Sequence, residues 1–257
     1  MFNLNEGLLA SIFTDVEYWA EMPWYAVIPA IIGVCAVAYL LGSINSAIII
    51  SRIFFGEDVR TKGSGNAGTT NMLRNYGKGA ALGTLLGDML KTAVAIAVAG
   101  VVFGFGYAGA ISVSELCYVA GMFSIIGHVF PVYYGFKGGK GVLSTATMVL
   151  ILSPIVFLIL ITIFILVVSF SKYVSLGSVL AASLFPVVLN GYFGVFQVQM
   201  PGLMALSSIL LAILIVWCHR ANLVRISNRT ESKLSFSKKP PKEEPEEDAP
   251  HGYGDEE

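Results

Sequence analysis

The sequence predicts an all-α fold, a polytopic bundle of seven transmembrane helices with the N-terminus outside and the C-terminus in the cytoplasm. Hydrophobic residues make up 55% of the 257 positions and charged residues only 13%, more apolar surface than a soluble core can bury. Apolar runs long enough to cross a bilayer recur along the chain. Basic residues gather between these runs, as they do in cytoplasmic loops.

Residues 1–26 precede the first apolar run. They carry four acidic residues but no Lys or Arg, so they lack the basic start of a signal peptide. We expect an external extension, either an interfacial helix with Trp19, Trp24 and Tyr25 at the lipid boundary or a poorly ordered segment.

The membrane domain is expected over residues 27–236. Its apolar runs are Val27 to Ser51, Ala80 to Phe105, Leu116 to Tyr134, Val142 to Phe170, Val174 to Asn190 and Leu203 to Cys218. The fourth is 29 residues long and contains Pro154, which would remove a backbone hydrogen bond and clash with the preceding turn. Two short spans with an external turn at the proline bring the total to seven.

This division also follows if all three basic clusters are cytoplasmic, because an even number of spans must then separate the second cluster from the third. The clusters are Arg52 to Lys78, Lys137 with Lys140, and Arg220 to Lys242. Residues 237–257 are rich in Pro, Lys and Glu, which predicts a disordered acidic cytoplasmic tail. We assign this tail no chemistry.

The loop after the first run is rich in residues that can surround an anion. It reads Gly63-Ser64-Gly65-Asn66-Ala67-Gly68-Thr69-Thr70-Asn71, followed by Arg74. Glycine lets backbone N–H groups approach an anion, and a following helix would point its positive end there. The pattern indicates a phosphate or carboxylate cradle, and the alternative is an ordinary tight turn.

A second motif reads Gly127-His128-Val129-Phe130-Pro131, then Phe136-Lys137-Gly138-Gly139-Lys140-Gly141. Two lysines separated by two glycines suit phosphate binding, although a flexible basic loop that only fixes topology has the same composition. His128 would either hydrogen-bond the loop backbone or transfer a proton.

The third motif follows the last apolar run. His219, Asn222 and Arg225 recur every three residues, so a helix would place them on one face, and Glu231 follows. The alternative is a basic juxtamembrane segment that only holds topology. Asp88 and Lys91, inside the second run, would form an ion pair or contact the site.

These motifs resemble those of the PlsY family, the membrane-integral acyl-phosphate:glycerol-3-phosphate acyltransferases of bacteria. The match runs from about Leu41 to Lys233 in the family's order and spacing. Asn45, Thr92 and Leu143 depart from the family's proline, glycine and alanine, but none of these changes removes a charged or hydrogen-bonding group of the motifs.

The resemblance implies transfer of a fatty acyl group from acyl phosphate to sn-glycerol 3-phosphate, giving 1-acyl-glycerol 3-phosphate (lysophosphatidic acid) and phosphate in phospholipid biosynthesis. It implies a multi-pass protein of the bacterial cytoplasmic (inner) membrane with its active site facing the cytoplasm. The partners would be these two substrates and membrane lipids, with room for a functional link to the enzyme that makes acyl phosphate. No nucleic acid, cofactor or metal is expected.

The resemblance also implies the site. The catalytic residues would be Ser64, Arg74, Lys140, His219 and Asn222. The residues that bind substrate would be Gly63, Gly65, Asn66, Gly68, Thr69, Asn71, His128, Lys137, Gly138, Gly139, Gly141, Arg225 and Glu231, supported by Asp88 and Lys91. The general base is open between His128, His219 and a substrate phosphate oxygen.

Two other classes can be weighed from the sequence. Soluble-type glycerolipid acyltransferases use a His-x-x-x-x-Asp pair, and no histidine here has Asp at that distance, which excludes that class and its acyl-carrier-protein or acyl-CoA donor. A transporter or channel for a phosphorylated solute is the main rival. Transporters often show inverted repeats, and we find no similarity between the two halves of the chain.

Overall fold

The computed structural model describes residues 24–104, 107–108 and 111–234. Most of the expected N-terminal extension and all of the expected tail lie outside these residues. The helices are α2 (Trp24–Ser43), α3 (Ser46–Phe55), α4 (Thr69–Phe103), α5 (Val113–Val129), α6 (Val142–Leu152), α7 (Pro154–Ser171), α8 (Val174–Val195), α9 (Gly202–Cys218) and α10 (Arg220–Ser227). The described residues also include two 3-10 turns, η2 (Val59–Thr61) and η3 (Val132–Tyr134), and the antiparallel pair β1 (Tyr107–Ala108) and β2 (Ile111–Ser112).

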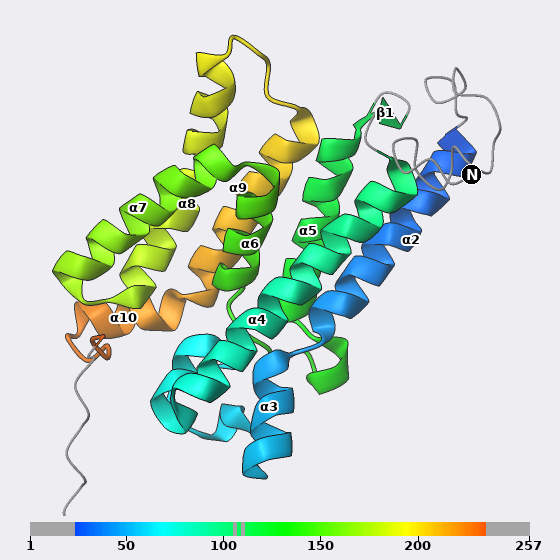
Figure 1. Ribbon diagram of the computed structural model, residues 1–257. Coiled ribbons are helices and arrows are strands. Elements are labelled where there is room, and N and C mark those ends of the chain that lie inside the picture. The colour runs from blue at the N-terminus through cyan, green and yellow to red at the C-terminus, as the bar shows by residue number, and fades with distance from the viewer. Residues whose placement is uncertain (1–23, 105–106, 109–110, 235–257) are drawn as a thin grey trace, which may run out of the picture.

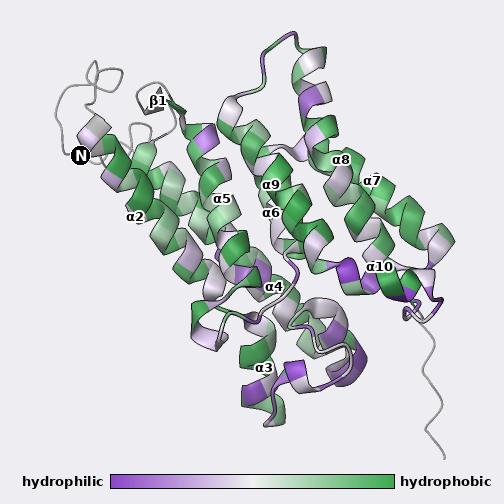
Figure 2. Ribbon diagram, turned by 180° about the vertical axis from the view of Figure 1, so that it is seen from behind, coloured by the Kyte–Doolittle hydropathy of each residue, from purple (hydrophilic) through white to green (hydrophobic). Residues whose placement is uncertain are grey.

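The long helices form two neighbouring groups (Figure 1). Helices α2, α4 and α5 pack together, and α8 packs between α7 and α9. The short helix α6 contacts α4 and α5 on one side and α7 on the other. Figure 2 shows hydrophilic residues gathered at the end of the bundle that carries α3, the start of α4 and α10, whereas the long helices are mostly hydrophobic. The bundle therefore has one polar end.

Several helices can cross a bilayer. Among the described residues five are long and apolar enough, and six if α9 and α10, bent by 52° at their junction, form one span. Helix α6 has only 11 residues, about 16 Å at the usual helical rise. The all-helical, multi-pass membrane fold is confirmed, and the count of seven spans stays a prediction.

Two helix breaks shape the polar end. The predicted break at the proline occurs, because α6 ends at Leu152 and α7 begins at Pro154. The first apolar run is also broken, which the sequence analysis did not predict. The Asn45 side chain accepts from the Ile48 N–H at 3.1 Å and so caps a new helix, α3, after α2 ends at Ser43.

The second span also starts earlier than predicted. Helix α4 begins at Thr69 rather than Ala80 and changes direction at Gly77, whose φ is 84°. Glycine tolerates this left-handed conformation. The start of α4 therefore belongs to the loop that carries the first motif.

Glycines bring α2 and α5 close together. A Cβ on Gly42 would lie 2.0 Å from the Ser124 carbonyl oxygen, and one on Gly127 would lie 2.2 Å from the Tyr39 carbonyl oxygen. Small residues allow this backbone contact within a membrane bundle. The contact fixes the end of α5, where His128 lies, and there the Tyr39 hydroxyl donates to the Phe130 carbonyl at 2.9 Å.

Candidate active site

A cavity of about 900 Å³ lies where the three motifs meet. Of the site residues predicted from the sequence, those that line the cavity are Gly63, Ser64, Asn66, Gly68, Thr69, Asn71, Arg74, Asp88, His128, Lys140, Gly141, His219, Asn222, Arg225 and Glu231. Gly65, Lys91, Lys137, Gly138 and Gly139 do not line it. The fold thus brings together residues that are up to 168 positions apart, from Gly63 to Glu231.

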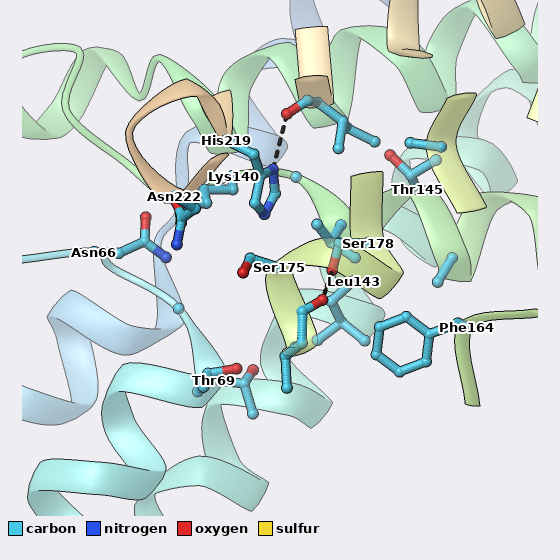
Figure 3. A pocket seen from close by; sticks show the side chains of 18 of the residues that line it. Asn66, Thr69, Lys140, Leu143, Thr145, Phe164, Ser175, Ser178, His219 and Asn222 are labelled. Atoms are coloured by element: carbon cyan, nitrogen blue, oxygen red, sulfur yellow. Dashed lines mark hydrogen bonds between the residues drawn. The ribbon is translucent and has the colours of Figure 1, made fainter. Parts of the chain in front are cut away.

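The cavity also has an apolar arm between α6, α7 and α8. Leu143, Val149, Phe157, Leu160, Phe164 and Phe185 line it. In Figure 3, Asn66, Asn222, Lys140 and His219 lie on one side of the cavity, and Phe164 and Thr145 lie on the other. One space therefore joins a polar end to an apolar end. The sequence did not predict this arm, because an apolar span does not reveal which of its faces borders a cavity.

Asn71 organises the first loop. Its amide nitrogen donates to the carbonyls of Val59 (3.1 Å) and Lys62 (3.0 Å), and its amide oxygen accepts from the Ser64 N–H at 3.0 Å. The side chain is buried. Asn71 was predicted to donate to substrate, but its two N–H donors are already engaged with the loop backbone. Its observed role is to shape the loop that presents Ser64.

Helices α4, α6 and α8 begin at the cavity without a side-chain cap. The N-cap residues are Gly68 for α4, Gly141 for α6 and Tyr173 for α8, and none makes a capping side-chain hydrogen bond. The first N–H groups of a helix lack intrahelical partners and carry partial positive charge. These helix starts favour an anion in the cavity.

Lys140 links the second motif to the third. Its ammonium group donates to the Asn222 amide oxygen, and the Asn222 amide donates to Glu231 Oε1 at 2.6 Å. Glu231 also accepts from Arg225 Nε at 2.7 Å and from the Ser175 hydroxyl at 2.9 Å. Glu231 therefore holds Arg225 directly and is linked to Lys140 through Asn222. Ser175 was not predicted.

The charges of this cluster are tuned by burial. Burial lowers the pKa of Lys140 to about 8, with Arg225 and Arg74 acting in the same direction and Glu231 opposing them. Burial raises the pKa of Glu231, but hydrogen bonds from Asn222, Arg225 and Ser175 outweigh it, and the net shift is downward. Near neutral pH the carboxylate is ionised, and Lys140 lies within reach of a protonation change.

His219 faces the cavity with one nitrogen available. Its Nδ1 lies 2.8 Å from the Ile215 carbonyl oxygen, shown by the dashed line at His219 in Figure 3. A carbonyl only accepts, so Nδ1 carries the hydrogen, and Nε2 of the neutral ring is a free acceptor. The ring is 3% exposed. This geometry suits a proton acceptor.

His128 supports the second loop. Its Nδ1 lies 2.8 Å from Lys91 Nζ, which also lies 2.8 Å from Asp88 Oδ1. A Cβ on Gly139 would lie 2.0 Å from His128 Nε2, and the Gly139 N–H donates to the His128 carbonyl at 3.1 Å. Of the two alternatives for His128, these contacts favour the structural one. The Asp88–Lys91 ion pair is present, and Asp88 also borders the cavity.

Sequence reasoning also missed Arg60. It is half-buried in η2 and donates to the Tyr134 carbonyl at 2.8 Å and the Lys137 carbonyl at 2.9 Å. The only signal in the sequence was Asp58 two residues earlier, which could have predicted a local ion pair.

Comparisons with known proteins point to one family. The family model described as glycerol-3-phosphate acyltransferase matches residues 32–229. The glycerol-3-phosphate acyltransferase of Chlorobaculum tepidum is 38% identical over 228 residues, which cover 81% of this chain and 98% of the relative. That of Clostridioides difficile is 38% identical over 205 residues, covering 80% of this chain and 96% of the relative.

Two solved structures are similar as well. The crystal structure of PlsY, an integral membrane glycerol 3-phosphate acyltransferase, in its glycerol 3-phosphate form is 30% identical with a TM-score of 0.69, covering 80% of this chain and 96% of that one. The lysophosphatidic acid form is 29% identical with a TM-score of 0.66, covering 80% and 95%.

Proposed function

The chain belongs to the PlsY family of membrane-integral glycerol-3-phosphate acyltransferases, and from this premise we propose that it moves a fatty acyl group from acyl phosphate to the 1-hydroxyl of glycerol 3-phosphate. The products are lysophosphatidic acid and inorganic phosphate, in phospholipid biosynthesis. An acyl phosphate donor links the protein to the enzyme that makes acyl phosphate.

One observation carries the proposal: a single cavity has a cationic polar end and an apolar arm. Arg74, Lys140 and Arg225 border the polar end, and Leu160 and Phe185 border the arm. Acyl phosphate and lysophosphatidic acid each combine an anionic phosphate with an apolar chain. A transporter for a small phosphorylated solute has no use for the apolar arm.

The acyl phosphate donor is supported by the number of anion-binding groups. Acyl phosphate is a mixed anhydride with phosphate as leaving group, so the protein has to bind two phosphates and orient the hydroxyl. The uncapped starts of α4, α6 and α8, together with Arg74, Lys140 and Arg225, supply donors for more than one phosphate.

In the proposed reaction, the glycerol hydroxyl oxygen attacks the acyl carbonyl carbon, and the bond from that carbon to the phosphate oxygen breaks. Lys140 and Arg74 neutralise phosphate charge, while the Ser64 hydroxyl and Asn222 position the reacting groups. The hydroxyl proton passes to a phosphate oxygen or to His219 Nε2. A His219→Asn variant distinguishes the two acceptors, because it loses most turnover only if the imidazole takes the proton.

The site is proposed to face the cytoplasm of the bacterial inner membrane, with the N-terminus outside and the C-terminus inside. In this topology the short helix α6 is added to the six longer spans to give seven. The basic clusters and the polar end of the bundle in Figure 2 support this orientation. Single cysteines in place of Ser64 and Ser232 should react with an impermeant reagent from the cytoplasmic side, and one in place of Val195 from the other side. Labelling of Ser64 and Ser232 positions from different sides would refute the orientation.

Purified protein in nanodiscs tests the activity. We expect lysophosphatidic acid and phosphate to form in equal amounts from acyl phosphate and glycerol 3-phosphate, and the rate to collapse in Lys140→Ala. Turnover with acyl-CoA or acyl carrier protein but not acyl phosphate would overturn the donor. A folded protein that binds glycerol 3-phosphate but forms no product would favour the transporter.

A further inference from the structure

Arg60 joins the two loops that form the polar end of the cavity, although it does not line the cavity. It lies in η2, just ahead of the first loop, and its Nη1 donates to the carbonyls of Tyr134 and Lys137 in the second loop. We propose that Arg60 is a positioning residue that fixes the position of Lys140 relative to Ser64. This inference rests on the proposed function and deepens it.

The Arg60 guanidinium is held rigidly by Asp58. Nε donates to Asp58 Oδ1 at 3.0 Å and Nη2 to Oδ2 at 2.8 Å, a two-bond contact that fixes the plane of the group. Asp58 also accepts from the Arg60 N–H at 3.0 Å, which caps η2. Hydrogen bonds from Arg60 hold the pKa of Asp58 well below its usual range. The charge of Arg60 is therefore matched locally rather than offered to substrate.

The first loop is attached to the same turn. Asn71 donates to the carbonyls of Val59 and Lys62, on either side of Arg60 in the chain, and accepts from the Ser64 N–H. Val59 is fully buried, which anchors η2 in the fold. Hydrogen bonds thus join Ser64 to Asn71 and Asn71 to the backbone of η2, which carries Arg60.

The second loop has an irregular backbone, and Arg60 supplies two of the hydrogen bonds that hold it. Between η3 and α6 the backbone adopts left-handed conformations at Gly135 (φ 65°) and Phe136 (φ 58°), and the latter is uncommon for a bulky residue. The Gly138 and Gly139 N–H groups donate to the end of α5. Arg60 fixes the opposite side of the loop, three residues before Lys140.

The competing explanation is that Arg60 only stabilises the fold, and Arg52 provides a matched control. Arg52 also donates to Asp58 Oδ2 at 2.8 Å, and it lies 5.7 Å from the Tyr134 ring, but among the described residues it donates to no carbonyl of the second loop. Removing Arg52 takes away a partner of Asp58 and leaves the two loop hydrogen bonds in place.

The test compares Arg60→Ala, Arg60→Lys and Arg52→Ala in full-length protein in nanodiscs. We expect Arg60→Ala to lower kcat/KM for glycerol 3-phosphate at least about tenfold, with a melting temperature close to that of Arg52→Ala. Arg52→Ala should stay within about threefold of wild type. Arg60→Lys should be intermediate, because an ammonium group cannot reproduce the fork. If Arg60→Ala does not fold, Arg60→Lys takes its place in the comparison.

A double-mutant cycle shows whether the effect passes through Lys140. Arg60→Ala should cost much less in a Lys140→Ala background than in wild type, whereas purely structural damage would add in full. Full additivity, or equal effects of Arg60→Ala and Arg52→Ala, would overturn the inference. Calorimetric binding of inorganic phosphate gives a readout without turnover, with Kd raised in Arg60→Ala alone. If the wild-type protein has no activity with acyl phosphate, the proposed function is refuted. The Kd for inorganic phosphate, compared between wild type and Arg60→Ala, would still decide the role of Arg60.

Discussion

Deprotonation of Lys140 should lower the activity of the enzyme in mildly alkaline solution. Burial, with Arg225 and Arg74 nearby, lowers the pKa of its ammonium group to about 8 from the ordinary value of 10.5. Only the protonated form neutralises a phosphate. Phosphate monoesters lose their second proton near pH 6, so the charge of glycerol 3-phosphate does not change in this range.

The size of the effect follows from the titration of one group. kcat/KM for glycerol 3-phosphate reports groups of the free enzyme, so it should be level near pH 7, halved at about pH 8 and about tenfold lower for each further pH unit. Stability should change in the opposite direction. Between about pH 8 and 10.5 the unfolded chain binds more protons at this lysine, so its contribution to the stability of the ligand-free protein rises with pH.

The assay measures lysophosphatidic acid formation from pH 6.5 to 9.5 alongside the melting temperature. Lys140→Arg is the control, because a guanidinium stays charged throughout; its overall rate should be lower, and its alkaline decline should be absent. A wild-type decline centred near pH 10, or the same decline in Lys140→Arg, would refute the reasoning. A parallel fall in melting temperature would assign the loss to unfolding instead.

Three further variants test the site. Arg74→Ala should cost at least about 2 kcal/mol of transition-state stabilisation, which lowers kcat/KM roughly thirtyfold. Near-normal product formation would remove Arg74 from the site. Gly139→Ala should abolish turnover and lower the melting temperature, since its methyl group would lie 2.0 Å from His128 Nε2; Gly79→Ala, with nothing within 4 Å of its Cβ, should have little effect on turnover. Glu231→Gln removes a charge that raises the pKa of Lys140, so the alkaline decline of kcat/KM should move to lower pH, and an unmoved pH profile would contradict this coupling.

The position of the motif residues followed largely from the sequence. Glycine, lysine and asparagine in Gly63–Asn71 and Phe136–Gly141 have few uses at a membrane surface other than turns and anion binding, and charge placement assigned both to one side. The cavity lining confirms that Ser64, Lys140 and Asn222 converge. The exact hydrogen-bond partners did not follow, and Asn71 is the clearest case, because its amide shapes the loop instead of pointing free donors at the cavity.

By itself, the sequence determined a multi-pass helical membrane protein and the helix break at Pro154. Both follow from local properties of the chain. Lipid demands long apolar segments with satisfied backbones, and Pro154 removes a backbone donor within a 29-residue apolar run. Proline alone does not end a helix here, since Pro29 and Pro186 lie inside α2 and α8. Only the tertiary structure decided which faces of α6, α7 and α8 form the apolar arm, and that Arg60 donates to two carbonyls of the second loop, 74 and 77 residues away in sequence. Such contacts depend on how helices pack, and a single sequence carries no local signal for the partner of a side chain that reaches across the fold.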